Sequence, residues 1–145
     1  MKKVINIILL VLWMLFIFYL SHQPGSISSV GSEGILTSIV TFIFNIFNLD
    51  TNSISSVVEF IHIPARELMH LFEYLILGVL VINVLNIYKI DKIVVISIML
   101  CFVYSVSDEV HQGFVAGRTF QYLDIFMDNL GSIIGILFYK YIKKL

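Results

Sequence analysis

VINIILLVLWMLFIFYL (residues 4–20) is an apolar run that follows two lysines and decides the class of fold. Asn6 is its one polar interruption. At about 1.5 Å per residue, a helix of this length spans roughly 25 Å, close to the thickness of the hydrocarbon core of a bilayer. A cleaved signal peptide is the alternative, but the run is long for one and no small-residue cleavage site follows it. We therefore expect a transmembrane helix here.

The composition of the whole chain agrees with a membrane location. Of its 145 residues, 59% are hydrophobic and 13% are charged, whereas a soluble domain has about a quarter charged residues. Further apolar segments lie at residues 68–86, 91–107 and 124–142. We expect an all-α integral membrane protein in which residues 1–145 form a single domain with four transmembrane helices.

The lysines indicate how these spans are oriented. All seven lysines fall near the two termini or between the second and third spans, on one side of the membrane. Both arginines and nine of the ten acidic residues fall on the opposite side. Because basic residues accumulate in cytoplasmic loops, we expect both termini to be cytoplasmic.

The predicted outer loop, residues 21–63, contains two amphipathic segments. Residues 35–49 are largely apolar, with a stripe of neutral polar side chains at helical spacing. This segment is short for a span, so it suits an outer-face amphipathic helix, either interfacial or re-entrant. Residues 53–61 are expected to form a short separate helix, and Pro64 to lie near the first turn of the second span.

Polar side chains are concentrated at the outer ends of the last three spans. On each helix, most of these side chains share one face, which we expect to turn inward because lipid penalises charge by several kcal/mol. They are Arg66, Glu67, His70, Glu73 and Tyr74, then Asp108, Glu109, His111 and Gln112, then Arg118, and finally Asp124, Asp128 and Asn129. Together they predict a polar pocket that opens to the outer leaflet beneath the amphipathic loop.

Asp108, Glu109 and His111 are the candidates for acid–base chemistry. Carboxyl groups crowded in a low dielectric can hold a proton near neutral pH, and a histidine can exchange it. The other members are candidates for binding, and Arg118 is suited to a phosphate or carboxylate. The alternative is a structural network in which the acids pair with the two arginines.

Several classes of function find no support in the sequence. The spacing of histidines and acids matches no metal-ligand motif, so we expect neither a metal nor another cofactor. No basic surface or nucleotide-binding loop indicates a nucleic acid or nucleotide partner. His22 and His62 are isolated in the outer loop and are expected to have no functional role.

Gly131 and Gly135 lie one helical turn apart on the face that also carries Asp124 and Asp128. Two small residues at this spacing allow another helix to approach closely. This face of the fourth span is therefore predicted to pack tightly against a neighbour.

The order of these motifs resembles that of the VanZ-like family. The matching residues are Glu67-x-x-His70-x-x-Glu73-Tyr74, Ser107-Asp108-Glu109-x-His111-Gln112-x-Phe114, Gly117-Arg118, Asp124-x-x-x-Asp128-Asn129, and the earlier turn from Tyr19 to Pro24. The resemblance covers the chain from about Leu12 to Leu137. It implies a small bacterial plasma-membrane protein whose founding relative is associated with resistance to the glycopeptide teicoplanin.

Three functions remain open. The favoured one is a cell-envelope protein that binds a membrane lipid, a lipid-linked envelope intermediate or a lipoglycopeptide antibiotic. The second is a membrane hydrolase or transferase that acts on a lipid headgroup, with Asp108 or Glu109 as the base and His111 as its partner. The third, a proton-coupled transporter or flippase, is disfavoured by the four short spans and the lack of an inverted repeat.

Overall fold

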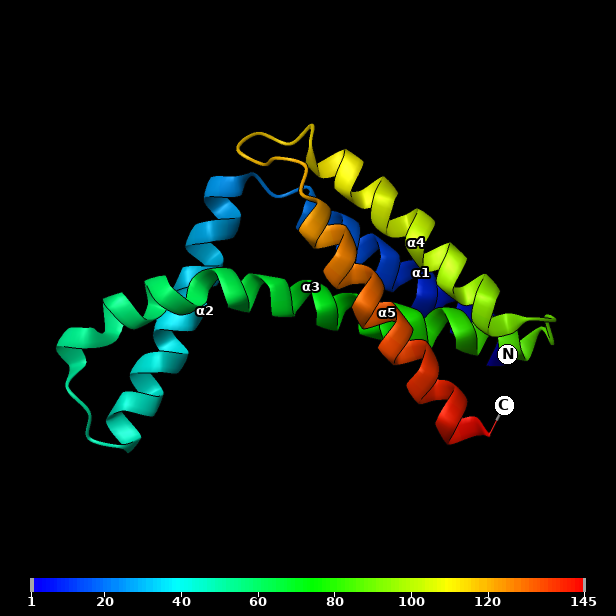
Figure 1. The fold of residues 1–145 in the computed structure, drawn as a ribbon, viewed down its shortest axis with the longest axis horizontal. Helices are drawn as coiled ribbons and strands as arrows, with labels where there is room; N and C mark the ends of the chain where they lie inside the picture. Colours follow the sequence, from blue (N-terminus) through cyan, green and yellow to red (C-terminus); the bar gives the residue numbers. More distant parts are fainter. Residues whose placement is uncertain (1, 145) are drawn as a thin grey trace.

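The computed structural model describes residues 2–144, which form helices joined by short connections (Figure 1). In chain order these are α1 (Lys2–Ser21), α2 (Gly25–Ile46), the 3₁₀ turn η1 (Thr51–Ser53), α3 (Ile54–Ile87), α4 (Ile93–Gln112) and α5 (Tyr122–Lys143). Five helices in this part of the chain are long and apolar enough to cross a membrane. The prediction of an all-α membrane protein is confirmed.

Four helical segments form the bundle: α1, α4, α5 and the second half of α3 (Figure 1). The two chain termini lie at the same end of this bundle (Figure 1). Its core is apolar and includes Ile17, Tyr74, Leu77, Ile82 and Ile136, each at most 1% exposed. The arrangement is compatible with four spans plus one additional helix.

The closest helix packing joins α3 and α5. A Cβ atom added at Gly131 would overlap the carbonyl oxygen of Leu71, and one added at Gly135 would overlap that of Leu75. Gly78 of α3 approaches the carbonyl group of Ser132 in the same way. The close approach predicted from the glycine spacing is therefore present, and it sets the position of α5 against α3.

α3 is one helix of 34 residues, so the prediction of a short helix at residues 53–61 separate from a span at 68–86 was wrong. Pro64 lies inside this helix rather than near its start. A proline removes one backbone hydrogen bond, but α3 packs against α2 before Pro64 and against α5 beyond it, which supports the helix on both sides. At about 1.5 Å per residue α3 is roughly 51 Å long, well beyond the ~30 Å hydrocarbon core.

α2 also begins earlier than predicted, at Gly25 rather than near residue 35. Its start is held by a distant loop: the Gly25 N–H donates to the Ala116 carbonyl at 3.0 Å, and Arg118 Nη2 donates to Ser28 Oγ at 3.0 Å. Serines and glycines favour a helix only weakly, so the local sequence did not indicate this start. α2 and residues 51–63 form a helical arm, here called the α2–α3 hairpin, that projects from the bundle (Figure 1).

α4 ends at Gln112, five residues beyond the predicted boundary at 107, and begins at Ile93 rather than at 91. This extension places Asp108, Glu109 and Gln112 within the helix, where they are buried. α5 begins at Tyr122, close to the prediction. The last turn of α4 and the first turns of α5 therefore hold the polar residues rigidly.

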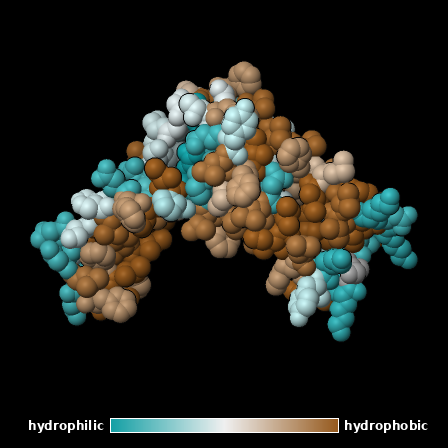
Figure 2. Space-filling model, in the orientation of Figure 1, coloured by the Kyte–Doolittle hydropathy of each residue, from teal (hydrophilic) through white to brown (hydrophobic). Residues whose placement is uncertain are grey.

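Apolar side chains cover much of the molecular surface (Figure 2). Exposed examples on the bundle are Val11, Phe102 and Phe138, and Phe42 and Phe60 are exposed on the α2–α3 hairpin. Polar residues gather at the end near the termini and at the tip of the hairpin (Figure 2). An apolar surface of this extent fits contact with lipid.

Candidate functional site

Polar side chains converge at the end of the bundle away from the termini. Asp108, Glu109, Gln112, Asp124 and Asp128 are each at most 4% exposed. Ionisable groups buried in such an apolar protein need partners. We use the name polar cluster for Arg66, Glu67, His70, Glu73, Tyr74, Asp108, Glu109, Gln112, Arg118, Asp124 and Asp128.

The two carboxyl groups of α5 connect to α3. Arg66 Nη2 donates to Asp124 Oδ2 at 2.9 Å and to Oδ1 at 3.3 Å. His70 Nδ1 lies 3.2 Å from Asp128 Oδ1, and its Nε2 lies 3.8 Å from Asp124 Oδ2. From α4, Ser105 Oγ donates to Asp128 Oδ2 at 2.9 Å. Because Gly131 lets α5 approach α3, these side chains meet without intervening residues.

A second set of contacts joins α4 to the end of α1. Ser21 Oγ donates to Asp108 Oδ2 at 2.8 Å. Gln112 Nε2 lies 3.4 Å from the same carboxyl oxygen, and Gln112 Oε1 accepts a hydrogen bond of 2.9 Å from Arg118 Nη1. Asp108 is therefore held at one oxygen by α1 and by its own helix.

Arg118 connects three helices. Besides Gln112 of α4 and Ser28 of α2, it donates to the backbone carbonyls of Leu20 at 3.3 Å and Gln23 at 3.2 Å. Burial lowers the pKa of Arg118, with a further contribution from the positive charge of Arg66, but a guanidinium group stays protonated in proteins. Each of its three side-chain nitrogens has a partner, so Arg118 stabilises the fold around the polar cluster.

Glu109 links α4 to the start of α5. Its Oε1 accepts the backbone N–H of Gln121 at 2.5 Å, just before the first turn of α5. The same side chain interacts electrostatically with Asp124, His70 and Asp128. Glu109 therefore belongs to the same electrostatic unit as the α3–α5 contacts.

Five buried side-chain atoms have no hydrogen-bond partner: Arg66 Nε, Glu67 Oε2, Tyr74 OH, Asp108 Oδ1 and Glu109 Oε2. All the unpaired buried side-chain atoms found among residues 2–144 thus belong to the polar cluster. Buried polar groups are almost always paired, and leaving one unpaired costs about 1–3 kcal/mol. The polar cluster therefore offers free hydrogen-bonding atoms to a ligand or to water.

Two of the predicted site residues make their side-chain hydrogen bonds outside the polar cluster. Asn129 Nδ2 donates to the Ile125 carbonyl of its own helix at 2.7 Å. His111 Nε2 lies 3.1 Å from His22 Nδ1, and the His111 ring stacks on Phe18 with 4.5 Å between ring centroids. A direct partnership of His111 with Asp108 or Glu109 stays a prediction.

Four polar residues that contact these groups were not predicted from the sequence. Ser21 and Ser105 bind the carboxyl groups of Asp108 and Asp128, Ser28 accepts a hydrogen bond from Arg118, and His22 pairs with His111. Single serines are common in apolar helices, so a serine alone does not indicate a functional site. The signal for Ser21 and His22 was their place in the turn from Tyr19 to Pro24, which is part of the motif pattern.

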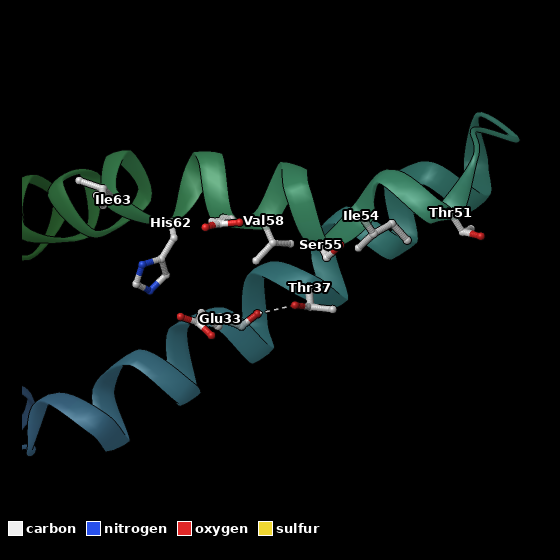
Figure 3. A pocket seen from close by; sticks show the side chains of 9 residues that line it. Glu33, Thr37, Thr51, Ile54, Ser55, Val58, His62 and Ile63 are labelled. Atoms are coloured by element: carbon white, nitrogen blue, oxygen red, sulfur yellow. Dashed lines mark hydrogen bonds between the residues drawn. The ribbon is translucent and has the colours of Figure 1, made fainter.

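An open groove of about 780 Å³ lies within the α2–α3 hairpin (Figure 3). Its polar wall includes Glu33 and Thr37 of α2 and Glu59 and His62 of α3, whereas Val58 belongs to its apolar wall. The predicted site residues do not line this groove. The groove ends near His62, one helical turn before Arg66, so it adjoins the polar cluster along α3.

No group of three or more His, Cys, Asp or Glu side chains within residues 2–144 is arranged to hold a metal ion. The polar cluster itself offers carboxyl, guanidinium, imidazole and hydroxyl groups. These groups can bind a polar head group or exchange protons with it.

Comparison with known proteins places the chain in a family. Neither the comparison with curated proteins nor the comparison with solved structures found a match. The model of the family described as VanZ/LLP1 matches residues 6–143, which include the whole polar cluster and the α2–α3 hairpin. With five helices in residues 2–144 that are long and apolar enough to cross a membrane, this chain is a membrane protein that belongs to the VanZ/LLP1 family.

Proposed function

We propose that the protein binds the polar head of a lipid-linked or lipidated ligand in the polar cluster and thereby protects a cell against glycopeptide antibiotics such as teicoplanin. The observation that carries this proposal is the set of five unpaired buried atoms. A cluster needed only for folding would have no reason to leave so many strong donors and acceptors free, because each destabilises the protein. A ligand head group that pairs with them removes this penalty.

The surroundings of the polar cluster suit a ligand that is anchored in the membrane. The bundle is covered with exposed apolar side chains, so an acyl chain can stay in lipid beside it. The side chain of Arg66 is 33% exposed and that of Glu67 is 12% exposed, which makes these two residues the accessible rim of the cluster. A head group can reach the buried oxygens from this rim.

We further propose that the protein lies in the bacterial plasma membrane with both termini in the cytoplasm. The seven lysines support this orientation, and the polar cluster and the α2–α3 hairpin then face outward. Fusions test it: a fluorescent protein at either terminus should fluoresce, and alkaline phosphatase at either terminus should be inactive. Active phosphatase at a terminus would contradict the orientation.

A membrane hydrolase or transferase acting on a lipid headgroup is the second candidate. Asp108 and Glu109 each have one carboxyl oxygen fixed by a partner and the other free, as a positioned general base requires. Mass spectrometry of lipid extracts distinguishes the two candidates. An enzyme should change a headgroup species when the wild type is expressed, whereas a binding protein should leave the lipid profile unchanged.

The proposed function is tested by measuring antibiotic sensitivity. A sensitive host expresses the wild type, Glu109→Gln, His111→Ala or Asp91→Asn, with equal amounts in the membrane. Asp91 is an exposed acid in the turn before α4, outside the polar cluster, and serves as the matched control. We expect the wild type and Asp91→Asn to raise the inhibitory concentration of teicoplanin, and the other two variants to fail.

Two results would count against this proposal. If Glu109→Gln protects as well as the wild type, the polar cluster is structural, and if His111→Ala does so, the adjoining contact of His111 with His22 has no role in protection. If the wild type itself gives no protection, the association with glycopeptides does not hold for this chain.

A further inference from the structure

The unpaired atoms of the polar cluster favour one kind of ligand. Three of the five are carboxyl oxygens, on Glu67, Asp108 and Glu109, and an ionised carboxylate can only accept hydrogen bonds. The Tyr74 hydroxyl can donate or accept, and only Arg66 Nε is restricted to donating. A ligand that pairs with these atoms must therefore act mainly as a hydrogen-bond donor.

The charge of the polar cluster points in the same direction. It contains two guanidinium groups, Arg66 and Arg118, and the imidazole of His70. Against them stand six carboxyl groups, those of Glu67, Glu73, Asp108, Glu109, Asp124 and Asp128. Asp128 and Asp108 both interact electrostatically with Glu73, as Asp124 does with Glu67. Like charges crowded in a low dielectric repel each other strongly, and a bound cation relieves that repulsion.

The groove of the α2–α3 hairpin extends this acidic character beyond the bundle, because Glu33 and Glu59 line it. Glu59, His62, Arg66 and His70 recur at spacings of three and four along α3, so they share one helical face. Glu33 lies across the groove from this face, and neither lysine nor arginine lines the groove (Figure 3). Its apolar wall gives it the amphipathic character that a lipid-like cation requires.

We propose that the ligand of the polar cluster carries a primary ammonium group, which passes along the α2–α3 groove and binds the free carboxyl oxygens of Asp108 and Glu109. This inference rests on the proposed function, because it names the chemistry of the same ligand. A primary ammonium brings three N–H donors and a positive charge, whereas a phosphate brings acceptors and negative charge. A metal ion fits less well, since no group of three ligating side chains is arranged to hold one in residues 2–144.

The experiment uses the full chain, purified in dodecyl maltoside. Trp13 is the one tryptophan of the sequence, and its Nε1 donates to the Glu73 carbonyl at 2.9 Å, so its fluorescence reports on the polar cluster. Dodecylammonium, dodecyltrimethylammonium and dodecyl phosphate are titrated separately. We expect dodecylammonium to bind at least tenfold more tightly than the other two, because only it offers both charge and N–H donors.

Variants locate the binding site. Asp108→Asn and Glu109→Gln should each weaken dodecylammonium binding at least tenfold, whereas Asp91→Asn should leave it unchanged. Glu67→Gln at the partly exposed rim provides a further variant whose folding is least at risk. Thermal unfolding of every variant checks that weaker binding does not come from loss of the fold.

Several results would overturn the inference: tighter binding of dodecyl phosphate, equal binding of all three amphiphiles, displacement of the amine by Mg²⁺ or Ca²⁺, or wild-type affinity in the folded variants. The two proposals can fail separately. Amine binding without antibiotic protection would overturn only the glycopeptide association. Antibiotic protection by a protein that binds no amine would overturn only this inference.

Discussion

Replacing Gly131 by alanine is expected to push apart the two helices that build most of the polar cluster. A Cβ atom at this position overlaps the carbonyl oxygen of Leu71 and lies 3.1 Å from its Cα atom. Because these are backbone atoms, no side-chain rotation can relieve the overlap. Asp124 and Asp128 share a helical face with Gly131, so a shift of α5 also moves them away from α3.

The magnitude follows from two opposing effects. Overpacking a tight contact destabilises a protein by about 1–3 kcal/mol, whereas glycine to alanine in a helix stabilises it by about 0.5–1 kcal/mol. Gly31→Ala in α2 isolates the second effect, because no heavy atom lies within 4 Å of a Cβ atom added there. The difference in unfolding free energy between the two variants should therefore be about 1–3 kcal/mol, or roughly 5- to 150-fold in the folding equilibrium.

Reversible unfolding by dodecyl sulfate in mixed micelles, followed by Trp13 fluorescence, measures this difference. We expect Gly31→Ala to equal or exceed the wild type in stability, and Gly131→Ala to fall below it. Gly135→Ala should behave like Gly131→Ala, because its Cβ atom would overlap the Leu75 carbonyl oxygen. Equal stability of Gly131→Ala and Gly31→Ala would refute the reasoning, since it would mean that α3 and α5 can separate without loss.

Three further predictions concern single contacts. Arg66→Gln leaves Asp124, which is 1% exposed, without its arginine partner, and we expect the unfolding free energy to fall by about 1–3 kcal/mol. The loss stays moderate because Arg66 is partly exposed, and adding Asp124→Asn should recover part of it. A double variant no more stable than Arg66→Gln would contradict this pairing. Asn83→Ala removes the hydrogen bond that Asn83 donates to Asn6 at 2.7 Å and the one that it accepts from Tyr139 at 2.8 Å. The unfolding free energy should fall by about 1–2 kcal/mol in the same assay, and an unchanged value would show that these bonds add nothing to stability. His22→Ala and His111→Ala should be non-additive by about 0.5 kcal/mol or more, because the two rings are in contact; strictly additive losses would argue against that contact.

The helices of the bundle were largely predictable, and the α2–α3 hairpin was not. A continuous apolar run such as residues 4–20 must form a helix in lipid, because its backbone groups have no other partners there. The start of α2 has no such signal: its serines and glycines are stabilised by Arg118 and by the loop around Ala116, which are distant in the sequence. Pro64 indicated a helix start, but α3 continues through it and packs against α2 before it and against α5 beyond it.

Most members of the candidate site could be named in advance, but their partners could not. Helical periodicity places His70 and Glu73 on one face of α3, and Asp124 and Asp128 on one face of α5. It contains no information on which residue of the facing helix each one meets. Asn129 was therefore named beside Asp128 as a candidate for binding, although its side chain donates to the backbone of its own helix.

That this is an all-α membrane protein, with both arginines and most of its acids on one side, follows from local features of the sequence, because hydropathy and helical period act over a few neighbouring residues. The packing of the helices, in contrast, pairs Arg66 with Asp124, 58 residues away, and Ser21 with Asp108, 87 residues away. It also decided which oxygens remain free, since Asp108 and Glu109 of α4 each find a hydrogen-bond partner at one oxygen only. Gly131 and Gly135 set the distance between α3 and α5; their spacing predicted a close approach, but not that the backbone of α3 would make it.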